Sequence, residues 1–138
     1  MCARKGLGVV PNATAKDGYE HRISGAWVQC ILRGGVHCFS VYMKDGDGAG
    51  ETNQAILAEL AAILGAVRGP WIVGGDWNMA PEVLARSGWP SIVEGRVAAP
   101  DQPTCNDKVY DYFVPSEALS ESVAGVVRLS DGGCNPHW

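Results

Sequence analysis

Trp71-Ile72-Val73-Gly74-Gly75-Asp76-Trp77-Asn78 is the stretch that says most about the fold of this 138-residue chain. Its apolar start predicts a short buried strand, and the two glycines allow another backbone or a ligand to come close. Because residues two apart in an extended chain point to the same side, we expect Asp76 and Asn78 to lie together where the strand ends. A carboxylate beside a carboxamide suits a hydrated hard cation and a phosphate group. The alternative is a plain turn in which both side chains bond only local backbone.

The segments around this strand predict a mixed α/β domain. Apolar residues recur at helical spacing over residues 51–67, with Thr52 or Asn53 as the cap and Gly69-Pro70 as the stop. Residues 81–86 predict a short helix and residues 87–103 are mostly loop, while further strands are predicted at 6–10, 26–32, 36–42, 109–114 and 123–129. This order of elements is typical of an α/β sandwich rather than of a regular βαβ alternation.

Residues 26–32 and 36–42 predict a hairpin, because Arg33-Gly34-Gly35 separates them and glycine accepts the positive φ of tight turns. With the two glycines as the turn, one largely apolar face collects Val28, Cys30, Leu32, His37, Phe39 and Val41. We expect that face to cover a core.

Length and composition predict a single globular domain over residues 1–138. The net charge of −4 argues against a simple DNA-binding module, but it says less about an enzyme whose metal ion supplies positive charge. Five cysteines without a Cys-x-x-Cys pair argue against a zinc site or a disulfide framework. Neither a leader nor a membrane-spanning run is evident, so we expect an intracellular protein without membrane contact, with the nucleus as one location.

Two further residues stand out for their surroundings. Asp111 lies in the apolar, aromatic run Val109-Tyr110-Asp111-Tyr112-Phe113-Val114, and a carboxylate buried there needs a partner. The alternative is a strand that alternates in and out, with Asp111 facing solvent. His137 lies in Cys134-Asn135-Pro136-His137-Trp138, and a lone histidine in a terminal segment is usually without a catalytic role.

Together these features resemble the endonuclease/exonuclease/phosphatase (DNase I-like) superfamily. Gly75-Asp76-Trp77-Asn78 is similar to its Gly-Asp-Phe-Asn motif, and the strand around Asp111, which runs on to Ser116, is similar to its Ile-Asp-Tyr strand. Tyr42, closing a strand before a polar loop and a helix, resembles a phosphate-contacting tyrosine, and Pro136-His137 resembles the end of the Ser-Asp-His motif. A proline before the histidine resembles endonuclease domains encoded beside reverse transcriptases in retroelements.

The resemblance implies a four-layer αββα sandwich that uses Mg²⁺ or Mn²⁺ and acts on DNA. It implies that Asp76 activates or orients the attacking water and contacts the metal through water, while Asn78 and Tyr42 hold the phosphate. His137 would act on the phosphate or as a base, with Asp111 fixing its tautomer and charge. Which of these residues is the general base stays open.

The sequence also departs from the family pattern. The strands that carry the family's Asn and its metal-binding Glu have no counterpart ahead of Gly6, Pro136 replaces an Asp, and the closing strand is absent after Trp138. We therefore expect a partial domain with weakened metal binding and little nuclease activity of its own. Two alternatives stay open: a phosphatase or phosphodiesterase acting on a lipid or a nucleotide, and a non-catalytic retroelement remnant with at most a binding role.

Overall fold

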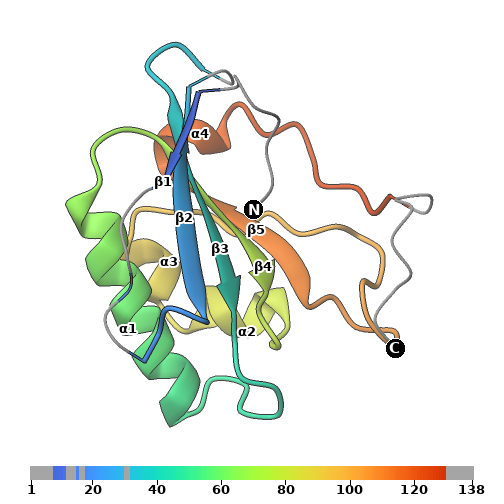
Figure 1. Ribbon diagram of the computed structural model, residues 1–138. Helices are drawn as coiled ribbons and strands as arrows, with labels where there is room; N and C mark the ends of the chain where they lie inside the picture. Colours follow the sequence, from blue (N-terminus) through green and yellow to red (C-terminus); the bar gives the residue numbers. More distant parts are fainter. Residues whose placement is uncertain (1–7, 12–14, 16–17, 30–31, 130–138) are drawn as a thin grey trace.

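The computed structural model describes residues 8–11, 15, 18–29 and 32–129. Within them, one five-stranded sheet has the order β1-β2-β3-β4-β5 (Figure 1). Its strands are β1 (Val9–Pro11), β2 (Ile23–Val28), β3 (Val36–Tyr42), β4 (Trp71–Asp76) and β5 (Asp111–Pro115). Only β3 and β4 run parallel among these neighbours, and α1 (Glu51–Ala66) connects them. The short helices are α2 (Pro81–Arg86), α3 (Trp89–Ile92) and α4 (Glu117–Ser120), so the mixed α/β class is confirmed.

One face of the sheet packs against helices α1, α2 and α3. Alternate residues of the central strands point to this face, namely Phe39, Val41, Val73, Tyr112 and Val114. They are buried together with apolar side chains of the three helices, among them Ile56, Leu60, Leu84 and Trp89. The helical spacing over residues 51–67 is confirmed by α1, whose buried stripe includes Ile56, Leu60, Ile63 and Leu64. On the opposite face Ser40 and Phe113 are exposed, whereas Ala26, Val28 and Val36 are buried.

The predicted cap of α1 is wrong. Gly50 occupies the N-cap position without a side-chain bond, and the Asp47 carboxylate instead accepts the N–H of Asn53 at 3.0 Å. The Asn53 side chain is buried; it accepts from the Lys44 N–H at 2.7 Å and donates to the Lys44 and Gly48 carbonyls at 3.0 and 2.9 Å. These bonds fix the loop that leads from β3 into α1.

The hairpin of β2 and β3 is confirmed, but its predicted register is wrong. Val28 pairs with Val36, where a two-glycine turn would have paired it with Val41. Gly34 and Gly35 have the predicted positive φ. The Gly35 N–H donates to the Leu32 carbonyl, so the two glycines form a turn within a longer connection between β2 and β3. Because pairing shifts by an odd number of residues, Val28 faces away from Val41, and Trp27 takes the helix-covered side. Cys30 lies outside the described residues.

The strand predicted at residues 123–129 is not present, since that segment has no helix or strand. A strand forms only beside a free sheet edge, and residues 96–98 already occupy the outer edge of β5. Ala98 and Phe113 exchange both backbone hydrogen bonds, at 2.8 and 2.9 Å, and the Arg96 N–H donates to the Pro115 carbonyl at 3.0 Å. None of the described helices is long and apolar enough to cross a membrane.

Candidate active site

Tyr42, Asp76 and Asp111 form one row across three neighbouring strands. Tyr42 pairs with Asp76 in the parallel β3–β4 register, and Asp76 pairs with Asp111 in the antiparallel β4–β5 register. Directly paired residues share a face, so all three side chains lie on the face away from the helices. Adjacent strands are about 4.8 Å apart, which brings side chains from three distant parts of the sequence within reach of one ligand.

The chain turns sharply after Asp76, and this turn rather than strand alternation brings Asn78 to Asp76. Strand β4 ends at Asp76 and Asn78 has φ 46°, so the prediction from extended-chain geometry is wrong at this point. The Asn78 N–H donates to Asp76 Oδ1 at 3.1 Å, and Asn78 Nδ2 donates to the Met43 carbonyl at 2.9 Å. The backbone bonds of the plain-turn alternative are thus present. They also hold the ends of β3 and β4 together beside the row.

Trp77 anchors this turn from the helix side. Its ring is fully buried, stacks on Tyr112 with 5.3 Å between centroids, and meets Trp89 edge-on at 5.8 Å. Trp77 Nε1 donates to the Tyr112 carbonyl at 3.0 Å, and its backbone N–H donates to the Tyr110 carbonyl at 2.8 Å. This role of Trp77 was not predicted from the sequence. A large aromatic residue between two candidate polar residues was the signal that could have revealed this anchor.

Both glycines of the motif allow close approach, as predicted, and the chain itself makes the approach. The Phe113 ring lies against Gly74, where an added Cβ would come within 2.6 Å of it. Gly75 has φ 155°, and a Cβ there would overlap the Val41 carbonyl. The glycines therefore allow β3, β4 and β5 to lie close together beneath the row.

The carboxylates of the row differ in environment. Burial raises the pKa of Asp76, the negative charges of Asp111 and Asp45 raise it further, and hydrogen bonding from Asn78 opposes the rise. Asp111 is the first residue of β5 and is exposed, with its N–H donating to Thr104 Oγ1 at 3.0 Å. The solvent-facing alternative for Asp111 is the correct one.

Tyr42 is half exposed at the other end of the row. The Arg22 guanidinium carbon lies 5.1 Å from the centre of its ring, and Arg22 Nη1 donates to the Tyr42 carbonyl at 3.4 Å. His137 and Pro136 lie outside the described residues, so the predicted pairing of Asp111 with His137 stays a prediction.

A hydrated hard cation fits this donor set better than a directly coordinated metal. Within residues 8–11, 15, 18–29 and 32–129, no group of three His, Cys, Asp or Glu side chains is placed to hold a metal ion. Asp76 and Asp111 still bring two carboxylates together, and their mutual repulsion raises the pKa of Asp76. Mg²⁺ keeps several waters and needs only one or two carboxylates, so Asp76 could hold it through water.

No protein-family model and no curated protein matches the chain. Solved structures do match it. The cytolethal distending toxin of Actinobacillus actinomycetemcomitans gives a TM-score of 0.55 at 18% identity, over 82% of this chain and 45% of the other. The toxin of Haemophilus ducreyi gives 0.54 at 18%, over 82% and 45%, and an AP endonuclease from Archaeoglobus fulgidus gives 0.50 at 16%, over 80% and 60%.

The chain has a DNase I-like fold. It spans about half the length of the solved structures it matches, and its described residues supply one sheet with helices on one face. The predicted fold class is therefore confirmed, and the chain covers part of such a domain. At these levels of identity the likeness shows the fold alone. Any reaction has to be argued from the residues of the row.

Proposed function

We propose that this chain is part of a divalent-metal-dependent phosphodiesterase that cleaves nucleic acid, of the retroelement endonuclease type. The observation that carries the proposal is the row of Tyr42, Asp76 and Asp111, with Asn78 held beside it. A phenol and two carboxylates on one sheet face, with an amide beside them, provide hydrogen-bond donors for a phosphate and a proton acceptor. One solved structure of similar fold is an AP endonuclease, which supports a nucleic-acid substrate.

The proposal assigns roles to the residues of the row and to Asn78 and His137. Tyr42 and Asn78 donate hydrogen bonds to the phosphoryl oxygens, and Asp76 orients the attacking water and accepts its proton. The raised pKa of Asp76 makes its carboxylate a stronger proton acceptor than an ordinary aspartate. Asp111 orients His137, which donates to the phosphate or acts as a base. Bound Mg²⁺ or Mn²⁺ would supply Lewis-acid stabilisation of the developing charge.

The retroelement assignment rests on Pro136-His137, and it implies a DNA substrate and an intracellular, nuclear place of action. The chain has no residue that matches the family's metal-binding Glu, so we expect turnover by these 138 residues alone to be slow.

Nicking of supercoiled plasmid DNA tests the proposal. We expect slow nicking that requires Mg²⁺ or Mn²⁺ and is lost in Asp76→Ala, because the water then lacks its proton acceptor. The matched control is Glu121→Ala, an exposed carboxylate at the C-terminus of α4, beyond the end of β5 opposite Asp111, which should nick like the wild type. Cleavage that continues with a chelator present, or in Asp76→Ala, would contradict the proposal.

A non-catalytic remnant is the second candidate, favoured by the net charge of −4 and by the missing counterpart of the family's metal-binding Glu. Such a remnant would bind DNA in a salt-dependent manner without nicking it at any metal concentration. The plasmid assay with a parallel binding measurement therefore separates the two candidates.

A further inference from the structure

Two arginines flank the candidate active site, one at each end of the row. Arg22 immediately precedes β2, and Arg128 comes from the segment after α4. They are far apart in the sequence, and neither belongs to the motifs that resemble the nuclease family. Their positions relative to Tyr42 and Asp111 give the site a pattern of cation, two carboxylates and cation.

Arg22 is fixed at the Tyr42 end. The Tyr42 N–H donates to the Arg22 carbonyl at 2.8 Å, which continues the β2–β3 register by one residue. The guanidinium of Arg22 lies over the Tyr42 ring and therefore on the face that carries the row. A cation held over an aromatic ring keeps its charge and has less side-chain freedom to lose when it meets a phosphate.

Arg128 is fixed at the Asp111 end. It lines a cavity of about 360 Å³ together with Asp111, Gly75 and the half-exposed Phe113. Arg128 Nη1 donates to the Pro103 carbonyl at 2.8 Å, which leaves the other guanidinium N–H groups for a ligand. The shared cavity places this cation beside the carboxylate that ends the row.

We propose that a nucleic-acid strand crosses the sheet at right angles to β3, β4 and β5, with Arg22 and Arg128 contacting phosphates on either side of the one facing Asp76. The inference rests on the proposed function and names the path of its substrate. The row and its flanks span at least three strand spacings, roughly 15 Å. That length corresponds to roughly four nucleotides at the 3.4 Å rise of one strand of duplex DNA.

Charge makes these two contacts important. The chain has a net charge of −4 and the row itself is acidic, so phosphates are repelled unless cations lie beside it. Each arginine that neutralises a phosphate of single-stranded DNA contributes about 0.7 to the slope of log K against log salt concentration. With few such contacts, the loss of one is a large part of the whole slope.

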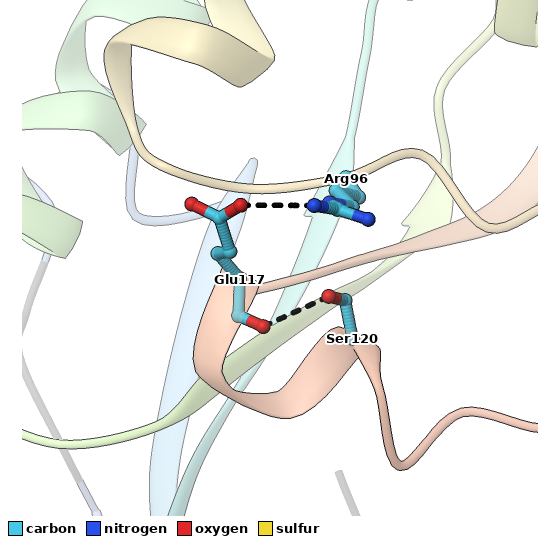
Figure 2. Close-up of polar contacts among 3 residues, drawn as sticks. All are labelled: Arg96, Glu117 and Ser120. Carbon is cyan, nitrogen blue, oxygen red and sulfur yellow. Dashed lines mark hydrogen bonds and ion pairs between the residues drawn. The ribbon is translucent and has the colours of Figure 1, made fainter.

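Arg96 offers a matched control. Figure 2 shows its guanidinium paired with the Glu117 carboxylate at 2.9 Å, while the Glu117 carbonyl accepts from Ser120 Oγ at 2.8 Å. The Arg96 N–H donates to the Pro115 carbonyl, at the opposite end of β5 from Asp111. The Arg96 charge is thus already neutralised and lies away from the row.

The test is fluorescence anisotropy of a labelled single-stranded oligonucleotide over a series of salt concentrations, with chelator present so that neither metal nor cleavage contributes. We expect Arg22→Gln and Arg128→Gln each to lower the salt slope by about 0.7, and the double variant by about twice that. Arg22→Lys and Arg128→Lys keep the charge and should keep most of the slope. Arg96→Gln should bind like the wild type.

The outcomes separate this inference from the proposed function. A wild-type chain that binds with a slope unchanged in Arg22→Gln and Arg128→Gln would overturn the path while leaving the nuclease proposal intact. No binding by the wild type would overturn the path, while the metal-dependent plasmid assay would still decide the nuclease proposal. An equal loss in Arg96→Gln would show a general charge effect and would also overturn the path. Melting temperatures of all variants confirm that each is folded.

Discussion

Asp76 lies at a candidate catalytic position, and its ionised carboxylate carries a cost to stability. Its ordinary pKa is 3.8, and burial together with Asp111 and Asp45 raises it in the folded chain. An aspartate whose folded pKa is raised binds protons more readily in the folded state than in the unfolded state. The ionised carboxylate therefore destabilises the fold above the folded pKa, and this cost disappears as the pH falls below 3.8.

Asp76→Asn should therefore be more stable than the wild type at neutral pH. Asparagine removes the charge and keeps an oxygen that accepts the Asn78 N–H. Because the site is partly solvated, we expect a rise in Tm of only roughly 2 °C, on the order of a few tenths of a kcal/mol. Thermal melts across pH check the sign, since the difference should vanish below the ordinary aspartate pKa. A variant that melts lower at neutral pH would count against the raised pKa.

Gly75→Ala should be strongly destabilising, because the backbone at φ 155° and the Val41 carbonyl leave no room for a Cβ. We expect a loss of roughly 3 kcal/mol or more in the free energy of unfolding, measured in urea. Gly65→Ala is the control: this exposed glycine of α1 has nothing near its Cβ position, and alanine there should stabilise by about 0.5–1 kcal/mol. Equal stability of the two variants would show that the strands are not packed as closely as described.

At the scale of the element, the start of α1 offers a test between two caps. The structure assigns capping to Asp47, which accepts the Asn53 N–H, rather than to Thr52. Asp47→Ala should therefore lower the free energy of unfolding by about 1 kcal/mol, whereas the exposed Thr52→Ala should change it by less than about 0.5 kcal/mol. Urea unfolding of both variants checks this. The reverse order would support the cap that sequence spacing suggested.

Local patterns predicted the elements better than their pairing. The apolar spacing of α1 and the apolar start of β4 are local properties, and both elements were found where expected. The hairpin register depends on how long the connection between β2 and β3 is, which glycine content alone does not determine. Residues 123–129 have strand-like composition but no strand, because the outer edge of β5 is already paired with residues 96–98.

At the scale of the whole molecule, the candidate site depends on the order of the strands. The sequence marked Tyr42, Asp76, Asn78 and Asp111 individually, yet their grouping requires β4 to lie between β3 and β5 in a specific register. The flanking Arg22 and Arg128 carried no local signal, because each is an isolated cation until the fold brings it to the row. Strand order is a long-range property, which is why the path across the sheet emerges only from the structure.

The most direct measurement is the broadening of backbone amide NMR signals by Mn²⁺ added well below the protein concentration. Weak binding is enough to broaden signals near the ion, so slow turnover does not obscure the result. We predict selective broadening at residues 75–78 and at Asp111, lost in Asp76→Asn and kept in Glu121→Ala, whose exposed carboxylate lies at the C-terminus of α4. Broadening that is centred elsewhere on the chain, or that persists in Asp76→Asn, would contradict a metal site at the row.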